Sequence, residues 1–236
     1  MRKFAVFDID GTLIRWQLYH AVVHELAKQN HLGKAALEEL RQLRMVWKRR
    51  EDPLAWKTYE HKIIELYESA LHSLRPETFD HAVTKVLDEY KDQAYVYTRN
   101  LIKQLKKKDV FLIIISGSHH EMIEQLAKYY GFDDWIGTRY ERDAQKFSGA
   151  KYVPSTEKGK VLRDFVAKHD LTYDGSWGVG DSAGDIPMLE LVEHPIAFNP
   201  DKVLYDHAVR SGWKIVLERK NVVYELERND GSYILV

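Results

Sequence analysis

The fold of this chain is decided by the stretch Phe4-Ala5-Val6-Phe7-Asp8-Ile9-Asp10-Gly11-Thr12-Leu13. The apolar run at its start is too short for a helix and has no polar alternation, which is typical of the central strand of a covered parallel sheet. The carboxylates of Asp8 and Asp10 follow that run directly. Because ligands of open α/β sheets bind at the carboxyl ends of the strands, the stretch predicts a functional site at this edge.

Further along the chain, buried strands again end in polar residues. The apolar run 110–115 leads into Ser116 and Gly117, and the run 176–179 leads into Gly180-Asp181-Ser182-Ala183-Gly184-Asp185. Short strands are also predicted over 135–140, 195–198 and 214–217, and helices over 119–130, 158–169 and 187–192. This alternation predicts an α/β class, with a doubly wound parallel-sheet core of the Rossmann type.

Residues 16–93 interrupt this core. Tyr19, Val22, Val23 and Leu26 recur at helical spacing, and the same spacing returns in three later segments, joined by polar links at 30–34, 49–53 and 73–77. We therefore expect a helical bundle over 16–93, inserted into a core formed by 1–15 and 94–236. Within the core range, 141–156 is a loop or an outlying hairpin, and Asp230-Gly231 supports a terminal hairpin over about 222–236.

The composition sets limits on function. The chain has 236 residues, 44% hydrophobic and 30% charged, with a net charge of -1 and no cysteine. A balanced charge gives no electrostatic reason to expect nucleic acid or a membrane surface as a partner, and the lack of cysteine excludes disulfides and thiolate catalysis. Because no stretch approaches the roughly 20 apolar residues that span a bilayer and no signal peptide is evident, we expect a cytoplasmic protein of unassigned oligomeric state.

Two familiar motifs resemble parts of this chain but do not match. A calcium loop starting at Asp8 would need glycine at its sixth position and glutamate at its twelfth, where Leu13 and Tyr19 stand. The glycines near Gly180 imitate a dinucleotide loop, yet Asp181 would occupy a place where a pyrophosphate needs bare backbone amides. Both interpretations are therefore rejected.

Phosphoryl transfer fits the residues better. Carboxylates crowded at one sheet edge repel one another unless a divalent cation lies among them, and hard oxygen ligands suit Mg²⁺. Asp8 can attack phosphorus and form an aspartyl-phosphate, while Asp10 protonates the leaving oxygen and later deprotonates water. Ser116, the amides that follow it and Lys158 can hold the phosphoryl oxygens. Lys160 and Lys151 stay open as alternatives to Lys158.

The chain resembles the haloacid dehalogenase superfamily, on its phosphoserine-phosphatase-like branch. The resemblance rests on four motifs, which are Phe7–Leu13, Ile115–Gly117, Lys158-Gly159 and Gly180–Asp185. Their order and spacing match from residue 4 to about residue 217. The resemblance implies a magnesium-dependent hydrolase whose helical insert is a cap over the site.

The resemblance also implies a role for each motif residue. Asp8 would be the nucleophile and a metal ligand, and Asp10 the acid/base and a ligand through its backbone carbonyl. Asp181 would be the third protein ligand, and Asp185 would orient Lys158 or a metal-bound water. The substrate-binding candidates in the motifs are Thr12, Ser116 and Gly117.

Residues of the insert would choose the substrate. Where phosphoserine phosphatases carry an acidic residue and an arginine that grip the amino acid, this chain has Gln17 and Tyr59, which argues against phosphoserine itself. A basic run, which is Arg41, Arg44, Lys48, Arg49 and Arg50, could contact nucleic acid or an anionic substrate tail, and a helix face of snorkelling side chains is the simpler interpretation. We retain Arg49 with Gln17 as substrate-binding candidates. His20 and His24 could bind metal, but we expect them on a solvated helix face.

These observations together predict a phosphomonoesterase that requires Mg²⁺ and acts on a small phosphorylated metabolite. A phosphotransferase that passes the phosphoryl group to an alcohol would use the same residues and stays an alternative. A regulatory protein that binds a phosphorylated metabolite without turnover is an alternative of another class. This alternative is disfavoured because a site without turnover would not need an acid/base, whereas this chain keeps the full set of reacting residues. They are Asp8, Asp10, Ser116, Lys158 and Asp181.

Overall fold

The computed structural model describes residues 1–52, 54–220 and 222–236. Within these ranges the chain divides into two compact units: residues 1–16, 90–138 and 153–236 form the first, and residues 17–89 and 139–152 form the second. The segment 139–152, which the sequence places in the core range, thus groups with the helical insert. Pro53, the last residue of the predicted link between the second and third helices, lies outside the described residues.

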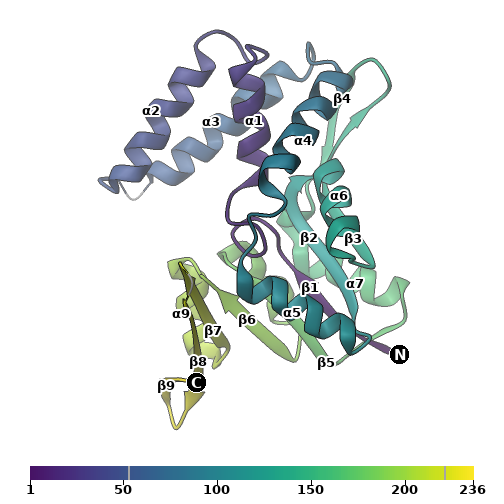
Figure 1. The fold of residues 1–236 in the computed structure, drawn as a ribbon, viewed down its shortest axis with the longest axis vertical. Helices are drawn as coiled ribbons and strands as arrows, with labels where there is room; N and C mark the ends of the chain where they lie inside the picture. The colour runs from purple at the N-terminus through teal and green to yellow at the C-terminus, as the bar shows by residue number, and fades with distance from the viewer. Residues whose placement is uncertain (53, 221) are drawn as a thin grey trace. The chain divides into compact units, whose positions relative to one another are not determined.

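The first unit is built on a parallel sheet. Its strands are β1 (Arg2–Phe7), β2 (Phe111–His119), β3 (Asp134–Arg142), β5 (Leu171–Gly180), β6 (His194–Phe198), β7 (Lys214–Arg219), β8 (Val222–Asn229) and β9 (Ser232–Leu235). They are hydrogen-bonded in the order β3-β2-β1-β5-β6-β7-β8-β9 (Figure 1). The strands from β3 to β7 are parallel, and β8 and β9 add the predicted antiparallel hairpin. The predicted α/β class is confirmed.

Helices of the first unit cover the sheet. They are α5 (Val96–Lys107), α6 (His120–Tyr130), α7 (Lys158–Lys168), α8 (Ile186–Leu189) and α9 (Lys202–Ser211). Phe4 and Val6 of β1 belong to one buried cluster with Leu162 of α7 and Leu204 of α9. Every side chain from Phe4 to Phe7 is fully buried, which explains why this part of β1 carries no polar residue. The helix α9 is an element that the sequence analysis does not predict.

The second unit contains the four predicted helices. They are α1 (Leu18–Lys28), α2 (Ala36–Arg49), α3 (Ala55–Ala70) and α4 (Pro76–Tyr90), labelled in Figure 1. The hairpin alternative for 141–156 is the correct one, because the end of β3 pairs antiparallel with β4 (Phe147–Tyr152). This hairpin is tied to the helices through Tyr140, whose hydroxyl lies 3.0 Å from that of Tyr19 and donates to Glu68 of α3.

No helix in the part of the chain that the structure describes is both long and apolar enough to cross a bilayer.

Candidate active site

Three neighbouring strands bring the predicted site residues to one edge of the sheet. Phe7 of β1 is in register with Ile114 of β2 on one side and with Val179 of β5 on the other. Asp8 leaves β1 at this edge, and its backbone N–H donates to the Val179 carbonyl at 3.0 Å. Parallel strands in register deliver their following residues to the same place, so the motifs meet as the sequence predicts.

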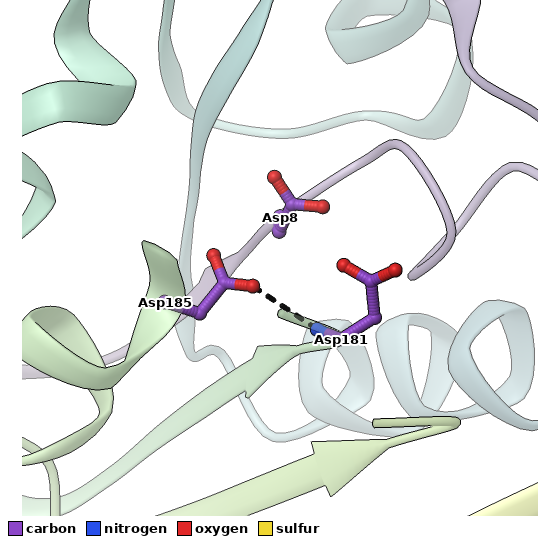
Figure 2. Close-up of side chains that lie close together, drawn as sticks. All are labelled: Asp8, Asp181 and Asp185. Carbon is purple, nitrogen blue, oxygen red and sulfur yellow. Dashed lines mark hydrogen bonds between the residues drawn. The ribbon is translucent and has the colours of Figure 1, made fainter. Parts of the chain in front are cut away.

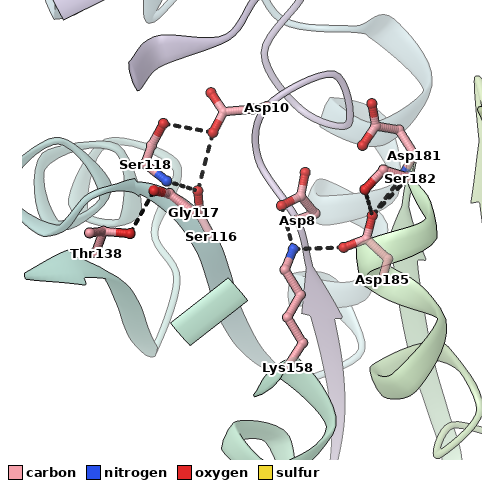
Figure 3. Close-up of polar contacts among 10 residues, drawn as sticks. All are labelled: Asp8, Asp10, Ser116, Gly117, Ser118, Thr138, Lys158, Asp181, Ser182 and Asp185. Carbon is pink, nitrogen blue, oxygen red and sulfur yellow. Dashed lines mark hydrogen bonds and ion pairs between the residues drawn. The ribbon is translucent and has the colours of Figure 1, made fainter. Parts of the chain in front are cut away.

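Lys158 joins two of the carboxylates. Its Nζ donates to Oδ1 of Asp8 and to Oδ1 of Asp185, both at 2.6 Å (Figure 3), and all three side chains are buried. Lys160 is exposed and pairs with Glu157, while Lys151 lies on β4 and pairs with Glu68. Of these three lysines, Lys158 is therefore the one that contacts Asp8.

The carboxylates are held at unusual pKa values. Burial raises the pKa of Asp8 from 3.8 to about 7, although the Lys158 ammonium opposes the shift, and the charges of Asp185 and Asp10 add to it. Burial also raises the pKa of Asp181 well above its ordinary value, and Asp8 and Asp185 raise it further. Burial alone would lower the pKa of Lys158, but the carboxylates of Asp185 and Asp8 raise it. The site is therefore short of positive charge.

A divalent cation fits this cluster. Asp8, Asp181 and Asp185 each offer one carboxylate oxygen, and these oxygens lie within 4.8 Å of one another (Figure 2). The backbone beside them leaves room for the Asp181 carboxylate, because Gly11 has a φ of +83° and a Cβ there would lie 2.1 Å from Oδ2 of Asp181. Clustered oxygen ligands are what hard cations such as Mg²⁺ prefer.

The carboxylate of Asp185 has other partners as well. Its Oδ2 accepts from the backbone N–H of Asp181 at 3.1 Å, and from the N–H and the hydroxyl of Ser182 at 3.0 and 3.1 Å. Its Oδ1 accepts from Lys158. Both oxygens are thus engaged in fixing the loop and the lysine, which favours a positioning role for Asp185 over direct ligation.

Asp10 is held on the other side of Asp8, by β2. Its Oδ2 accepts from the hydroxyl of Ser118 at 2.7 Å and from that of Ser116 at 3.3 Å (Figure 3). The Gly117 carbonyl accepts from Thr138 of β3 at 2.7 Å. Ser118 and Thr138 are residues that sequence reasoning missed. Ser118 follows the predicted motif directly, whereas Thr138 has no local signal and is found only from the pairing of β3 with β2.

Thr12 lies next to these residues in the chain. It is fully buried, and its Oγ1 has no hydrogen-bond partner among the described residues. Gln17 and Arg49 belong to the second unit, where Gln17 stands at the N-cap of α1 and Arg49 is an exposed residue in the last turn of α2. The substrate-binding roles of these three residues stay predictions.

The predicted solvated face at His20 and His24 is wrong. His20 is only 3% exposed and packs against the rings of Trp56 and Tyr59, which α3 lays on α1. The Nε2 of His24 lies 2.5 Å from the Tyr59 hydroxyl. Burial lowers the pKa of His20 to about 3 and that of His24 to about 4, so both rings are neutral at pH 7. Tyr59 itself is fully buried in this aromatic cluster.

Known proteins resemble this chain in sequence and in fold. A protein from Neisseria meningitidis serogroup C named histidinol-phosphatase is 23% identical over 231 residues, which are 92% of this chain and 99% of that protein. A solved structure of a Bordetella pertussis protein of unknown function has a TM-score of 0.71 and 22% identity, covering 91% of this chain and 98% of its own. A phospho-aspartyl intermediate analogue of phosphoserine phosphatase has a TM-score of 0.65 and 19% identity, with 93% and 95% covered.

The similarity to these solved structures shows a shared fold. The family is shown by a family model that covers most of the chain. The model of the haloacid dehalogenase-like hydrolases matches residues 5–190, which include the Asp8 motif, the Ser116 motif, Lys158 and the Asp181 motif. The predicted resemblance is thereby confirmed, and the chain belongs to the haloacid dehalogenase-like hydrolase family.

Proposed function

We propose that this protein is a magnesium-dependent phosphomonoesterase that hydrolyses a small phosphorylated metabolite through an aspartyl-phosphate at Asp8. Family membership and a relative named as a phosphatase support phosphatase activity on a phosphorylated substrate. The observation that carries the mechanism is the contact of the buried Asp8 carboxylate with Lys158 at 2.6 Å, beside the carboxylates of Asp181 and Asp185. A nucleophile, a fixed cation and a cluster of oxygen ligands are the parts that phosphoryl transfer needs.

The carboxylates of Asp8 and Asp181 would hold the divalent cation, with the backbone carbonyl of Asp10 as a third protein ligand. When bound, Mg²⁺ offsets the negative charge of the carboxylates and of the phosphate group. Lys158 would contact the phosphoryl oxygens, because Asp185 keeps its Nζ beside Asp8. Two positive groups of this kind allow a dianionic substrate to approach a carboxylate nucleophile.

In the first step, an oxygen of Asp8 bonds to phosphorus as the bond from phosphorus to the leaving oxygen breaks. The leaving oxygen takes a proton from the Asp10 carboxyl and departs as an alcohol. In the second step, Asp10 accepts a proton from water as the water oxygen bonds to phosphorus. The bond between Asp8 and phosphorus then breaks, which releases inorganic phosphate and restores the Asp8 carboxylate and the protonated Asp10 carboxyl.

The helical second unit would act as the cap that encloses the substrate, with Gln17 and Arg49 as candidate contacts. Thr12, Ser116 and Gly117 would line the phosphate end. Histidinol phosphate is a sensible first substrate to assay, because a relative of matching length is named histidinol-phosphatase. We propose screening it together with phosphoserine, other amino-alcohol phosphates, sugar phosphates and nucleotides.

The test is hydrolysis of p-nitrophenyl phosphate with and without Mg²⁺. Activity is expected to require both the ion and Asp8, so Asp8→Asn should abolish it, while the exposed control Asp164→Asn keeps it. Full activity of Asp8→Asn would overturn the proposal. Adding an acceptor alcohol separates the phosphotransferase alternative, because transfer lowers the phosphate released per phenol formed. A protein that binds phosphometabolites without turnover would release none.

A further inference from the structure

The hydroxyl of Ser118 makes a close contact with the proposed acid/base. It donates to Oδ2 of Asp10 at 2.7 Å, and the Ser118 side chain is buried (Figure 3). The Ser116 hydroxyl reaches the same oxygen at the longer distance of 3.3 Å. Asp10 is half-buried, and a carboxylate oxygen that accepts two hydroxyl donors is oriented by them.

The end of β2, which carries Ser118, is fixed from three directions. The backbone N–H of Ser118 donates to the Ser116 hydroxyl at 3.0 Å, and Thr138 holds the Gly117 carbonyl at 2.7 Å. β3 also lies against the end of β2, because a Cβ on Gly137 would lie 2.6 Å from the Ser118 carbonyl oxygen. The Ser118 hydroxyl is thus held in place before any substrate arrives, as positioning groups must be.

Capping of the next helix does not account for the Ser118 side chain. The N-cap residue of α6 is His119, which makes no side-chain cap hydrogen bond. The Ser118 hydroxyl donates to Asp10, which lies 108 positions away in the sequence. This long-range hydrogen bond fixes the Asp10 carboxylate and does not cap α6.

We propose that Ser118 is a positioning residue that orients the Asp10 carboxyl for proton transfer. Because its hydroxyl donates to Oδ2, we expect the proton of the neutral carboxyl on Oδ1, from which the leaving oxygen would take it. When the leaving oxygen takes that proton, the negative charge that forms on the carboxylate keeps the Ser118 hydrogen bond. This inference rests on the proposed function, in which Asp10 is the proton donor.

The test compares leaving groups. A nitrophenol departs without a proton, whereas a weakly acidic alkylphenol needs one, so general-acid help matters only for the second. In Ser118→Ala, kcat/KM should fall about tenfold for an alkylphenyl phosphate and less than about twofold for p-nitrophenyl phosphate. The plot of log kcat/KM against leaving-group pKa should therefore be steeper than in the native protein. An equal loss across the series would overturn the inference.

Matched variants separate positioning from simple destabilisation. Ser176→Ala also removes a buried hydroxyl from the sheet, one that donates to the Tyr173 carbonyl and accepts from the Glu193 N–H, and it should leave the slope unchanged. In an Asp10→Ala background, adding Ser118→Ala should change kcat/KM by less than about twofold. A further tenfold loss there would mean that Ser118 acts on something other than Asp10.

Three outcomes can be told apart: a Ser118 variant that does not fold, a native protein without phosphatase activity, and a Ser118 that does not position Asp10. If Ser118→Ala does not fold, Ser118→Cys replaces it, since a thiol is close in size and a weak donor, and the steeper slope is again the expected result. Native protein that hydrolyses no phosphate ester would overturn the proposed function. Native activity that depends on Asp8, together with an unchanged slope in the Ser118 variant, would overturn the positioning role alone.

Discussion

The Nζ of Lys158 lies 2.6 Å from Oδ1 of Asp8, although 150 positions separate the two residues in the sequence. Both side chains are buried, so each ion would be costly without the other. The pair exists because β1 ends at the place where α7 begins. The carboxylates of Asp181 and Asp185 lie beside Asp8 at the same edge of the sheet.

Lys158→Met should lower kcat/KM for an aryl phosphate by about 10²- to 10³-fold, because it removes a fixed cation from the developing phosphoryl charge. Lys160→Met is the matched control. Lys160 lies two residues further along α7, is exposed and pairs with Glu157, so its variant should retain full activity. Equal losses in the two variants would contradict the assignment of Lys158.

Magnesium affinity should rise with pH. The pKa of Asp8 is about 7 in the folded protein and 3.8 ordinarily, so the folded state holds the proton more tightly than the unfolded chain. The contribution of Asp8 to the stability of the metal-free protein is therefore lost as pH rises from 3.8 to about 7.

The cation must displace the same proton. We therefore expect Mg²⁺ to raise the melting temperature more at about pH 8 than at about pH 5. Melting curves with Mg²⁺ or EDTA at both pH values measure this. An increase that is the same at both would show that Asp8 does not exchange its proton for the metal.

Gly11→Ala should weaken Mg²⁺ binding at least about tenfold, because the new Cβ would displace the Asp181 carboxylate. Gly231 provides the control. Its φ of +84° nearly equals the +83° of Gly11, but a Cβ there meets nothing within 4 Å. Gly231→Ala thus adds the same backbone strain without the clash, and isothermal titration should show native affinity for it. If both variants bind Mg²⁺ as the native protein does, Asp181 is not a ligand.

Glu218 anchors the segment that follows the Asp8 motif. Its carboxylate is 1% exposed, pairs with Arg15, and accepts from the backbone N–H groups of Val96 and Tyr97 at 3.1 and 2.8 Å. Glu218→Ala leaves these donors unpaired and should lower the free energy of unfolding by about 3 kcal/mol in urea titrations.

The exposed pair of Lys202 and Asp206 supplies the comparison for Glu218. Asp206→Ala should change the free energy of unfolding by less than about 1 kcal/mol, because surface ion pairs contribute little. If the two variants lose similar stability, the Glu218 contacts do not hold this segment.

Much of the fold follows from local patterns. The apolar run before Asp8 predicts a central strand, and helical spacing predicts the four helices of the insert. The helix α9 is not predicted because its ten residues include only two buried ones, Leu204 and Ala208. Two buried positions are too few to give a recognisable helical periodicity. Asp201 is the N-cap of this helix, and its side chain accepts from the Leu204 N–H. Aspartate is a preferred N-cap residue, so its place in the sequence could have indicated the start of the helix.

Contacts between distant residues set the limit of sequence reasoning at the site. Helical spacing places His20 and His24 on one face of α1, but it cannot show that Trp56 and Tyr59 cover that face. In the same way, no local pattern links Ser118 to Asp10, because the hydrogen bond depends on the register of β1 against β2. The motifs give the reacting groups, and tertiary packing decides which neighbours orient them.

Trapping the phosphorylated enzyme tests the central claim most directly. Protein mixed with an aryl phosphate and Mg²⁺ is quenched in acid and reduced with borohydride, which converts an aspartyl-phosphate to homoserine, and the peptide that contains Asp8 is sequenced by mass spectrometry. We predict homoserine at position 8 in the native protein and none in Asp8→Asn. Phosphate release by native protein without modification at position 8, or with homoserine at another aspartate, would contradict the account.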